Sequence, residues 1–150
     1  MAKDPPRLSA TPLATWERDG IKAALTKAGL PADDVDSATL HFWRVEMEDL
    51  TPVGFGALEI HGEHALLRSV VTLPPLRHRG IGSAIVAALE TEARNTGCRA
   101  IWLLTIDATP LFSRLGYESC ERTSVPAAIR QTQQFAALCP ASAAVMTKSL

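Results

Sequence analysis

The spacing of apolar residues changes along the chain, and the change predicts two kinds of element. Residues 39–47, 52–60 and 64–73 are rich in strand-forming side chains and partly alternate between apolar and polar positions. The connections between them are short, and "HGE" (61–63) is typical of a tight hairpin turn. We therefore expect these three segments to form an antiparallel meander.

From Ile81 the apolar residues recur with helical spacing, and this helix is expected to end near Thr96, where Gly97 can adopt a left-handed conformation. The apolar residues of the pattern are Ile81, Ile85, Val86, Leu89 and Ala93. Residues 100–106 ("AIWLLTI") are apolar at consecutive positions, which is typical of a strand buried on both faces. Residues 66–72, the helix and residues 100–105 therefore predict a βαβ unit with parallel strands and a right-handed crossover.

Shorter signals complete the predicted fold. A first strand is expected near residues 7–10, and residues 13–28 predict a helix that ends before Gly29. The residues expected on the buried face of this helix are Leu13, Trp16, Ile21, Ala24, Leu25 and Ala28. Beyond residue 106 we expect a short helix with Thr109 as N-cap and Pro110 in its first turn, a strand from residue 117, a helix over 126–138 and a closing strand over 143–149. The pattern indicates an α+β fold with a mixed sheet and helices on both faces.

The size and charge of the chain narrow the classes of function. Its 150 residues and 16.1 kDa suffice for one hydrophobic core, so residues 1–150 are expected to form a single domain. A formal net charge of -1 argues against general binding to nucleic acids or anionic membranes, because both need a basic excess. The N-terminal sequence lacks the apolar core of a signal peptide, and the 3 cysteines form no CxxC pair. We therefore expect a cytoplasmic protein with reduced thiols.

The sequence "LPPLRHRGIG" (73–82) joins the third meander strand to the predicted helix. The first N–H groups of a helix have no intrahelical acceptor, and the helix dipole favours an anion at this end. Gly80 and Gly82 let an anion approach the backbone, and Arg77 and Arg79 add positive charge, so we predict a pyrophosphate site. A Walker loop is excluded because no Gly-Lys-Ser/Thr follows, and Ile85 stands where a Rossmann fingerprint needs a third glycine.

The motif and the order of the elements around it resemble the GNAT N-acetyltransferase superfamily. "RHRGIG" matches the R/Q-x-x-G-x-G/A motif of that superfamily, and "LFSRLGY" (111–117) is similar to its LYxxxGF segment. The resemblance extends from about Thr39 to Tyr117. The segments "LLRSVV", "LLT" and "TQQFAALCPASAAVMTK" further resemble GNAT proteins encoded in bacterial arsenic-resistance gene clusters. This finer resemblance implies acetylation of a small-molecule amine.

The resemblance implies that acetyl-CoA is the cosubstrate and that the acetyl group passes directly to the amine, without a metal. The pyrophosphate would bind the loop and helix start, and the pantetheine arm would lie along Val70–Thr72. The two parallel strands would splay at their C-terminal ends, and a backbone N–H near Val71 would stabilise the oxyanion. The cofactor-binding residues expected on this basis are Val70, Val71, Thr72, Arg77, His78, Arg79, Gly80, Ile81, Gly82 and Ser83. The resemblance leaves a homodimer open.

The catalytic residues cannot be transferred from the family. Phe112 stands where the family often has a tyrosine that protonates the thiolate, and Leu66 stands where it often has a glutamate base. Tyr117 is expected to pack rather than to react. Other polar side chains, namely His64, Ser69, Thr105 and Ser113, carry no specific signal for either role. The missing tyrosine keeps a second class of function open, a CoA-binding sensor module with weak or no catalysis.

Arg68 lies within the apolar strand "ALLRSVV", where a charged side chain must be paired or face a cleft. One interpretation is a salt bridge to a neighbouring carboxylate such as Glu59. The other is a cation at the floor of the acceptor site that binds an anionic group of the substrate. The substrate-binding residues expected from the second interpretation are Arg68, Ser69 and Thr105. No metal is expected at His61 and His64, because no third ligand is evident.

Overall fold

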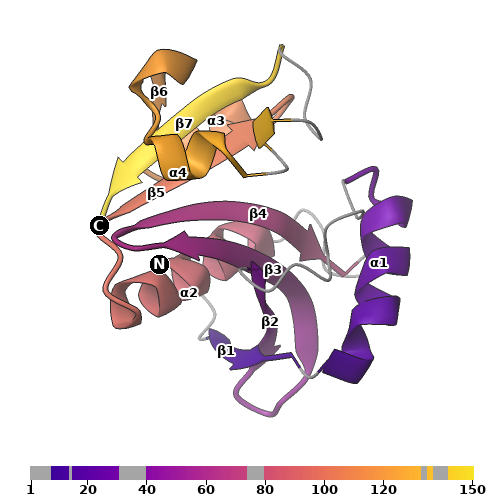
Figure 1. The fold of residues 1–150 in the computed structure, drawn as a ribbon. Coiled ribbons are helices and arrows are strands. Elements are labelled where there is room, and N and C mark those ends of the chain that lie inside the picture. Colours follow the sequence, from indigo (N-terminus) through magenta and orange to yellow (C-terminus); the bar gives the residue numbers. More distant parts are fainter. Residues whose placement is uncertain (1–7, 14, 31–39, 74–79, 133–134, 137–141) are drawn as a thin grey trace, which may run out of the picture.

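The computed structural model of the chain describes residues 8–13, 15–30, 40–73, 80–132, 135–136 and 142–150. In this part of the chain, the strands form one mixed sheet in the order β1-β2-β3-β4-β5-β7-β6 (Figure 1). Their bounds are Leu8–Pro12 (β1), Leu40–Met47 (β2), Pro52–His61 (β3), His64–Thr72 (β4), Ala100–Thr105 (β5), Glu118–Cys120 (β6) and Ala144–Ser149 (β7). The predicted α+β fold with a mixed sheet is confirmed.

The antiparallel meander is also confirmed. Strand β2 pairs with β3 and β3 pairs with β4, both antiparallel. The predicted hairpin turn lies between the paired residues His61 and His64, and Gly62 adopts a φ of 63° in it. Because this backbone conformation is unfavourable for residues with a side chain, Gly62 allows the tight connection between β3 and β4.

The βαβ unit consists of β4, helix α2 (Ile81–Asn95) and β5. Strands β4 and β5 are parallel, and their pairing covers His64, Ala65 and Leu66 on β4 with Ala100, Ile101 and Trp102 on β5. Beyond these pairs the two strands diverge, as the right-hand part of Figure 1 shows. The predicted splaying of the two strands is therefore present.

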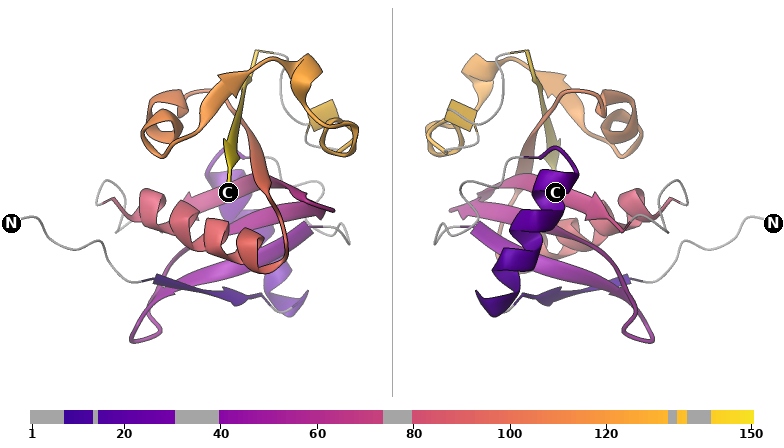
Figure 2. Two further views of the ribbon diagram at one scale, coloured as in Figure 1. Left: turned by 90° about the vertical axis from the view of Figure 1, so that its left-hand side faces the viewer. Right: turned by 90° about the vertical axis from the view of Figure 1, so that its right-hand side faces the viewer.

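Helices cover both faces of the sheet. Helix α2 packs on one face, and α1 (Arg18–Lys27) lies on the opposite face, as the two views of Figure 2 show. Helix α4 (Ala127–Arg130) contributes to a third cluster around Leu66. The largest cluster joins α2 to residues on β2–β5 and β7, and a second cluster joins α1 to β2–β4. Within the described segments, none of the helices has the length and apolar character needed to cross a membrane.

Three local expectations were wrong in detail. The predicted helix over 13–28 begins with a 3₁₀ turn, Thr15–Glu17, before α1. A 3₁₀ turn has fewer residues per turn than an α-helix, so the side chain of Trp16 does not align with the buried side chains of Ile21 and Leu25. Trp16 is 81% exposed. Helix α3 (Thr109–Arg114) has Ala108 as its N-cap, so Thr109 is its first helical residue.

The helix expected over 126–138 is interrupted in the structure, because α4 covers only Ala127–Arg130 of it and the described residues Phe135 and Ala136 are helical again. Helix α4 ends at Arg130, followed by Gln131 as its C-cap. Residues 133–134 and 137–138 of the prediction lie outside the described residues. The closing strand, expected over 143–149, is β7 at Ala144–Ser149.

Candidate active site

The candidate site lies where β4 and β5 separate. Strand β5 stays paired with β7 along its whole length, from Ala100 to Thr105. On the other side, β4 continues to pair with β3 as far as Thr72. Since the pairing of β4 with β5 ends at Leu66, the β4 edge that follows faces the opening between the two strands. This edge is where the resemblance to the GNAT superfamily implies that the pantetheine arm lies.

A β-bulge changes the direction of β4 within this edge. The register passes from Ala57↔Arg68 to Phe55↔Val71, so Ser69 and Val70 together oppose one residue of β3, Gly56. Ser69 has a φ of 61°, which is rare for a residue with a side chain and indicates local strain. Because of the bulge, the residues after Ser69 no longer follow the regular alternation of side chains between the two faces, and the backbone of Val70–Thr72 changes direction.

A cavity of about 290 Å³ lies against this re-aimed segment. Val70, Val71 and Thr72 line it from β4, and Ala28 and Leu30 line it from the end of α1. Three of the predicted cofactor-binding residues therefore share one cavity wall. On the neighbouring strand β3, Gly56 packs closely against α2, because a Cβ built on it would collide with Cδ1 of Leu89.

The N-terminus of α2 lies next to the end of β4. Gly80 precedes the helix with a φ of 73°, and a Cβ built on it would meet no atom within 4 Å. A Cβ on Gly82 would lie 3.7 Å from Oγ1 of Thr72, so the helix start and the strand end are adjacent. The N–H groups of the first turn have no acceptor within the helix, and this turn contains no acidic residue.

The structure thus brings two of the predicted cofactor segments together. The residues concerned are Val70, Val71, Thr72, Gly80, Ile81, Gly82 and Ser83. Arg77, His78 and Arg79 lie outside the described residues. The positive charge that they add to the loop therefore remains an expectation from the sequence.

Arg68 lies on the face of β4 that is turned toward α1 and α4. Its side chain is buried at 4% exposure, and its Nε donates a hydrogen bond to Oγ of Ser69 at 3.2 Å. Its cross-strand partner Ala57 belongs to the cluster under α1, while Leu66, two residues earlier, belongs to the cluster under α4. The guanidinium is therefore buried between two apolar clusters, next to the strained bulge.

Thr105, the third predicted substrate-binding residue, ends β5 on the other side of the opening. Its hydroxyl oxygen accepts a hydrogen bond of 3.0 Å from the N–H of Ala108, the N-cap of α3. This contact anchors the start of α3 to the end of β5. The hydroxyl proton of Thr105 can still be donated to another acceptor.

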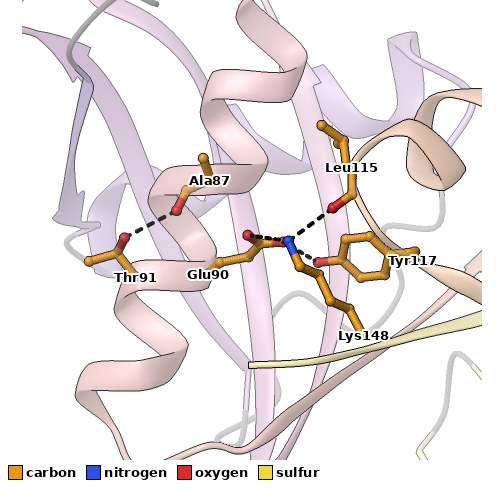
Figure 3. A network of polar contacts seen from close by, with 6 residues as sticks. All are labelled: Ala87, Glu90, Thr91, Leu115, Tyr117 and Lys148. Carbon is orange, nitrogen blue, oxygen red and sulfur yellow. Dashed lines mark hydrogen bonds and ion pairs between the residues drawn. The ribbon is translucent and has the colours of Figure 1, made fainter.

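Two aromatic residues of α3 and its C-terminal turn occupy the region where the family often has its acid. The rings of Phe112 and Tyr117 make an edge-to-face contact with centroids 5.4 Å apart. The hydroxyl of Tyr117 donates a hydrogen bond of 2.9 Å to Oε2 of Glu90, which Figure 3 shows. Burial, together with the negative charge of Glu90, raises the pKa of Tyr117 well above its ordinary value. Tyr117 therefore keeps its proton and packs, as expected from its position.

Sequence reasoning gave little weight to three polar residues near the start of the opening. Glu59 is 5% exposed on β3 and lies directly opposite Leu66. The Nε2 atom of His61 is 3.9 Å from Oε2 of Glu59. Nδ1 of His64 accepts a hydrogen bond of 3.1 Å from the indole of Trp102, so the neutral ring carries its proton on Nε2. The signal for Glu59 was its position in the otherwise apolar strand "GFGALEI".

No group of three or more histidine, cysteine or acidic side chains within the described segments is arranged to hold a metal ion.

Comparison with known proteins identifies the family. Residues 9–117 match the Acetyltransferase (GNAT) family. A stretch of 95 residues is 35% identical to an amino-acid acetyltransferase of Mycobacterium tuberculosis. The stretch makes up 61% of this chain and 54% of that protein, so the chain spans about half the length of this relative.

Solved structures are similar over nearly the whole chain. N-acetylglutamate synthase from Neisseria gonorrhoeae, in complex with coenzyme A and N-acetyl-glutamate, has a TM-score of 0.76 at 16% identity, over 99% of this chain and 36% of that one. A Mycobacterium tuberculosis protein in complex with CoA has a TM-score of 0.70 at 24% identity, over 97% of this chain and 99% of that one. These likenesses establish the fold, and the family match covers most of the sequence. The chain therefore belongs to the GNAT acetyltransferase family.

Proposed function

We propose that the chain transfers the acetyl group of acetyl-CoA directly to the primary amine of a small, anionic molecule such as an amino acid. The observation that carries this proposal is the buried guanidinium of Arg68 beside the opening between β4 and β5. In the proposal, residues 1–150 act as one cytoplasmic domain without a metal, and neither nucleic acid nor membrane is a partner. A homodimer is compatible with the proposal.

The arrangement around β4 supports acetyl-CoA as the donor. A pyrophosphate at the start of α2 would meet unpaired N–H groups and the positive end of the helix dipole. The open space above Gly80 leaves room for it there. From that point the pantetheine arm would follow Val70–Thr72 toward the opening. The bulge at Ser69 would direct a backbone N–H near Val71 toward the thioester oxygen, where it would stabilise the tetrahedral oxyanion.

Arg68 supports an anionic acceptor. A guanidinium offers a planar set of donors that suits a carboxylate, and such a charge-assisted pair is strong where water is excluded. Ser69 holds Nε of Arg68, which orients the group. Thr105, across the opening, would add a hydroxyl donor to the acceptor site. The relative that is named an amino-acid acetyltransferase agrees with this chemistry.

The finer resemblance to acetyltransferases of arsenic-resistance gene clusters belongs to the same proposal. It would make the acceptor a toxic analogue of an amino acid. The same set of contacts, a cation for the acid group and an opening for the amine, would serve either acceptor. A panel of acceptors therefore has to include both ordinary amino acids and phosphonate or arsenical analogues.

A second function, a CoA-binding sensor with weak or no transfer, is favoured by one observation. The position of the usual tyrosine acid holds Phe112, and the neighbouring Tyr117 is bonded to Glu90. Because a CoA thiolate is a tolerable leaving group, an acid is useful but not essential, and we favour the transferase. Thiol release decides between the two functions.

The experiment is thiol release from acetyl-CoA in the presence of single amines. A transferase releases CoA in proportion to the acceptor, and the product is an acetylated amine that mass spectrometry identifies. A sensor binds acetyl-CoA in calorimetry but releases thiol with none of the amines. The proposal predicts that anionic amines are better acceptors than neutral amines of the same size.

The variant Arg68→Met tests whether Arg68 binds the anionic group of the acceptor. It should weaken binding of an anionic acceptor by about 1.5–3 kcal/mol, while acetyl-CoA affinity and the melting temperature change little. If Arg68 serves instead to neutralise a buried carboxylate, the melting temperature should fall by the equivalent of about 3–5 kcal/mol. Arg44→Met is the reference for a broken pair, because Arg44 of β2 is paired with the buried Glu46 and with Glu17 of the 3₁₀ turn, so its melting temperature should fall while the affinity for the acceptor is unchanged.

A further inference from the structure

Of the large apolar side chains that the structure describes, Trp16 is the most exposed, at 81%. It lies on the 3₁₀ turn Thr15–Glu17, directly before α1, so an ordered turn holds the ring in solvent. Tryptophan buries a large area when it is covered, and it is enriched among the residues that contribute most to protein interfaces. Trp16 therefore presents an indole that a partner molecule could cover.

A cavity of about 270 Å³ lies beside this turn. The first half of α1 and the start of β3 form its walls, with apolar side chains that include Ile21 and Phe55. Glu17, the residue that follows Trp16, also lines it. A cavity of about 150 Å³ takes up one benzene molecule, so this cavity is large enough for an indole. The exposed ring and a cavity of suitable size are therefore neighbours on one surface.

Gly20 lines the same cavity from within α1. A Cβ built on it would meet no atom within 4 Å, so the described structure leaves room for a side chain there. Glycine is less favourable than alanine inside a helix, because it loses more backbone freedom on folding. It does allow another group to approach the helix closely. The exposed Trp16 and the helical Gly20 are thus both unfavourable in an isolated chain, and both suit a complex.

Two charged residues of the cavity suit the polar parts of an indole. Arg44 and Glu17 both line the cavity, and Nη1 of Arg44 donates a hydrogen bond of 2.8 Å to Oε2 of Glu17. A buried indole N–H needs an acceptor, and a carboxylate accepts several hydrogen bonds. A guanidinium binds favourably over the face of an aromatic ring. The cavity therefore offers polar contacts for a tryptophan side chain in addition to its apolar walls.

We infer that Trp16 of one copy of the chain inserts into this cavity of a second copy, and that the second copy does the same in return. The exposed ring and the cavity lie side by side, so a two-fold axis between them brings each ring to the cavity of the other copy. The interface involves the start of α1, whereas Ala28 and Leu30 beyond its other end line the cavity against β4. The dimer interface is therefore separate from the candidate active site, and the inference does not depend on the proposed function.

The size of this interface predicts a weak, reversible dimer. A tryptophan buries about 150–250 Å², and the cavity that receives it loses a similar area. Two such contacts bury about 600–1,000 Å² in total, which is below the range of about 1,200–2,000 Å² for stable complexes. We therefore expect a dissociation constant in the micromolar range and a monomer that stays folded on dilution.

Sedimentation velocity between about 1 μM and about 1 mM of chain tests the inference. Trp16→Ala removes the ring, and Gly20→Leu fills the cavity without a clash in the monomer. Each should raise the dissociation constant of the dimer at least about tenfold. Ile106→Ala, at another side chain that is 71% exposed, and Thr26→Leu, at an exposed position of α1, should leave it unchanged. A native protein that stays monomeric, or a dimer that Trp16→Ala does not weaken, overturns the inference.

A mixture of the two variants tests the reciprocal insertion directly. Trp16→Ala retains the cavity and Gly20→Leu retains the ring, so a mixed dimer can form one of the two contacts. A dimer of either variant alone can form neither. The mixture should therefore dimerise more strongly than each variant by itself. No gain on mixing the two folded variants overturns the inference.

Tryptophan fluorescence distinguishes insertion into a second copy from insertion into the same chain. The emission of the native protein should shift to shorter wavelength as its concentration rises, because the ring of Trp16 leaves water. That of Trp16→Ala should not shift, since Trp43 is buried and Trp102 is half-buried at every concentration. Emission of the native protein that does not depend on concentration overturns the inference, and this measurement stays decisive even where Gly20→Leu fails to fold.

Discussion

The ammonium of Lys148 on β7 and the carboxylate of Glu90 on α2 form an ion pair of 3.1 Å inside the molecule (Figure 3). The side chain of Glu90 is 7% exposed and that of Lys148 is 24% exposed. Lys148 also donates a hydrogen bond of 2.9 Å to the carbonyl of Leu115, which caps α3. Lys148 of β7 therefore connects α2 to the end of α3.

Removal of this ion pair should destabilise the fold. Lys148→Met would leave the carboxylate of Glu90 buried with Tyr117 as its remaining hydrogen-bond donor. We expect the free energy of unfolding to fall by about 3 kcal/mol, the lower end for a broken buried pair, because Lys148 is partly exposed. Urea denaturation measures the change. The double variant with Glu90→Gln should recover part of the loss, and a double variant that is no more stable than Lys148→Met would contradict this explanation.

The stability should fall at alkaline pH because of Tyr117. Its pKa is raised in the folded state, first by burial and then by the charge of Glu90. The associated stability is fully present below the ordinary tyrosine pKa of about 10 and is lost as pH rises above it, by up to about 1.4 kcal/mol per pH unit. Since Tyr117 is the only tyrosine, phenolate absorbance should appear together with unfolding. Tyr117→Phe should reduce the pH slope, and phenolate formation in the folded protein would contradict the prediction.

A negative charge at the start of α2 should weaken acetyl-CoA binding. Gly80→Asp places a carboxylate where the pyrophosphate is proposed to bind, and we expect a loss of about 2 kcal/mol, or about thirtyfold in Kd. Gly80→Asn is the control, because asparagine has the same shape and tolerates the positive φ of this position about as well. Calorimetric titration with acetyl-CoA measures both. Equal affinities of the two folded variants would rule out an anion site at this helix end.

Substitution of Phe112 tests whether the lack of a tyrosine acid at this position limits the reaction rate. If the CoA thiolate leaves without an acid, Phe112→Tyr should change kcat by no more than a few fold. An increase of about a hundredfold, the scale of general acid catalysis, would indicate that protonation of the thiolate is slow in the native protein. It would favour the sensor function. The edge-to-face contact with Tyr117 gives the check on folding, because its loss would lower the melting temperature.

Much of the fold could be predicted because the sequence encodes it locally. The period of the apolar residues placed α2 within one residue of its observed end, and the apolar run "AIWLLTI" identified β5 as a central strand. Where one face of a segment is only partly apolar, local reasoning failed. Trp16 shows this, because a 3₁₀ turn before α1 rotates it into solvent. The end of α4 at Arg130 could not be read from "VPAAIRQTQQFAALCP", whose helical propensity continues past it.

In the candidate site, too, some features follow from local sequence and others depend on contacts between distant residues. That Gly80 and Gly82 lie next to the end of the strand Val70–Thr72 could be predicted, because the strand, the loop and the helix are consecutive in the chain. The relation of Glu59 to Leu66 depends on the register between two strands, and a register is set by packing on both faces. The pairing of Glu90 with Lys148 joins residues 58 positions apart, which no local pattern encodes.

The sequence by itself determined the kinds and order of the elements, the meander, the parallel pair and the glycine-rich helix start, because these follow from periodicity, turn chemistry and backbone freedom. Only the tertiary structure decided that β4 and β5 part after Leu66 and that a bulge at Ser69 re-aims the strand. It also decided that Glu59 and Arg68 share one buried face. These features depend on how strands pair and how side chains far apart in the sequence share one interior, and that is settled only when the whole chain packs.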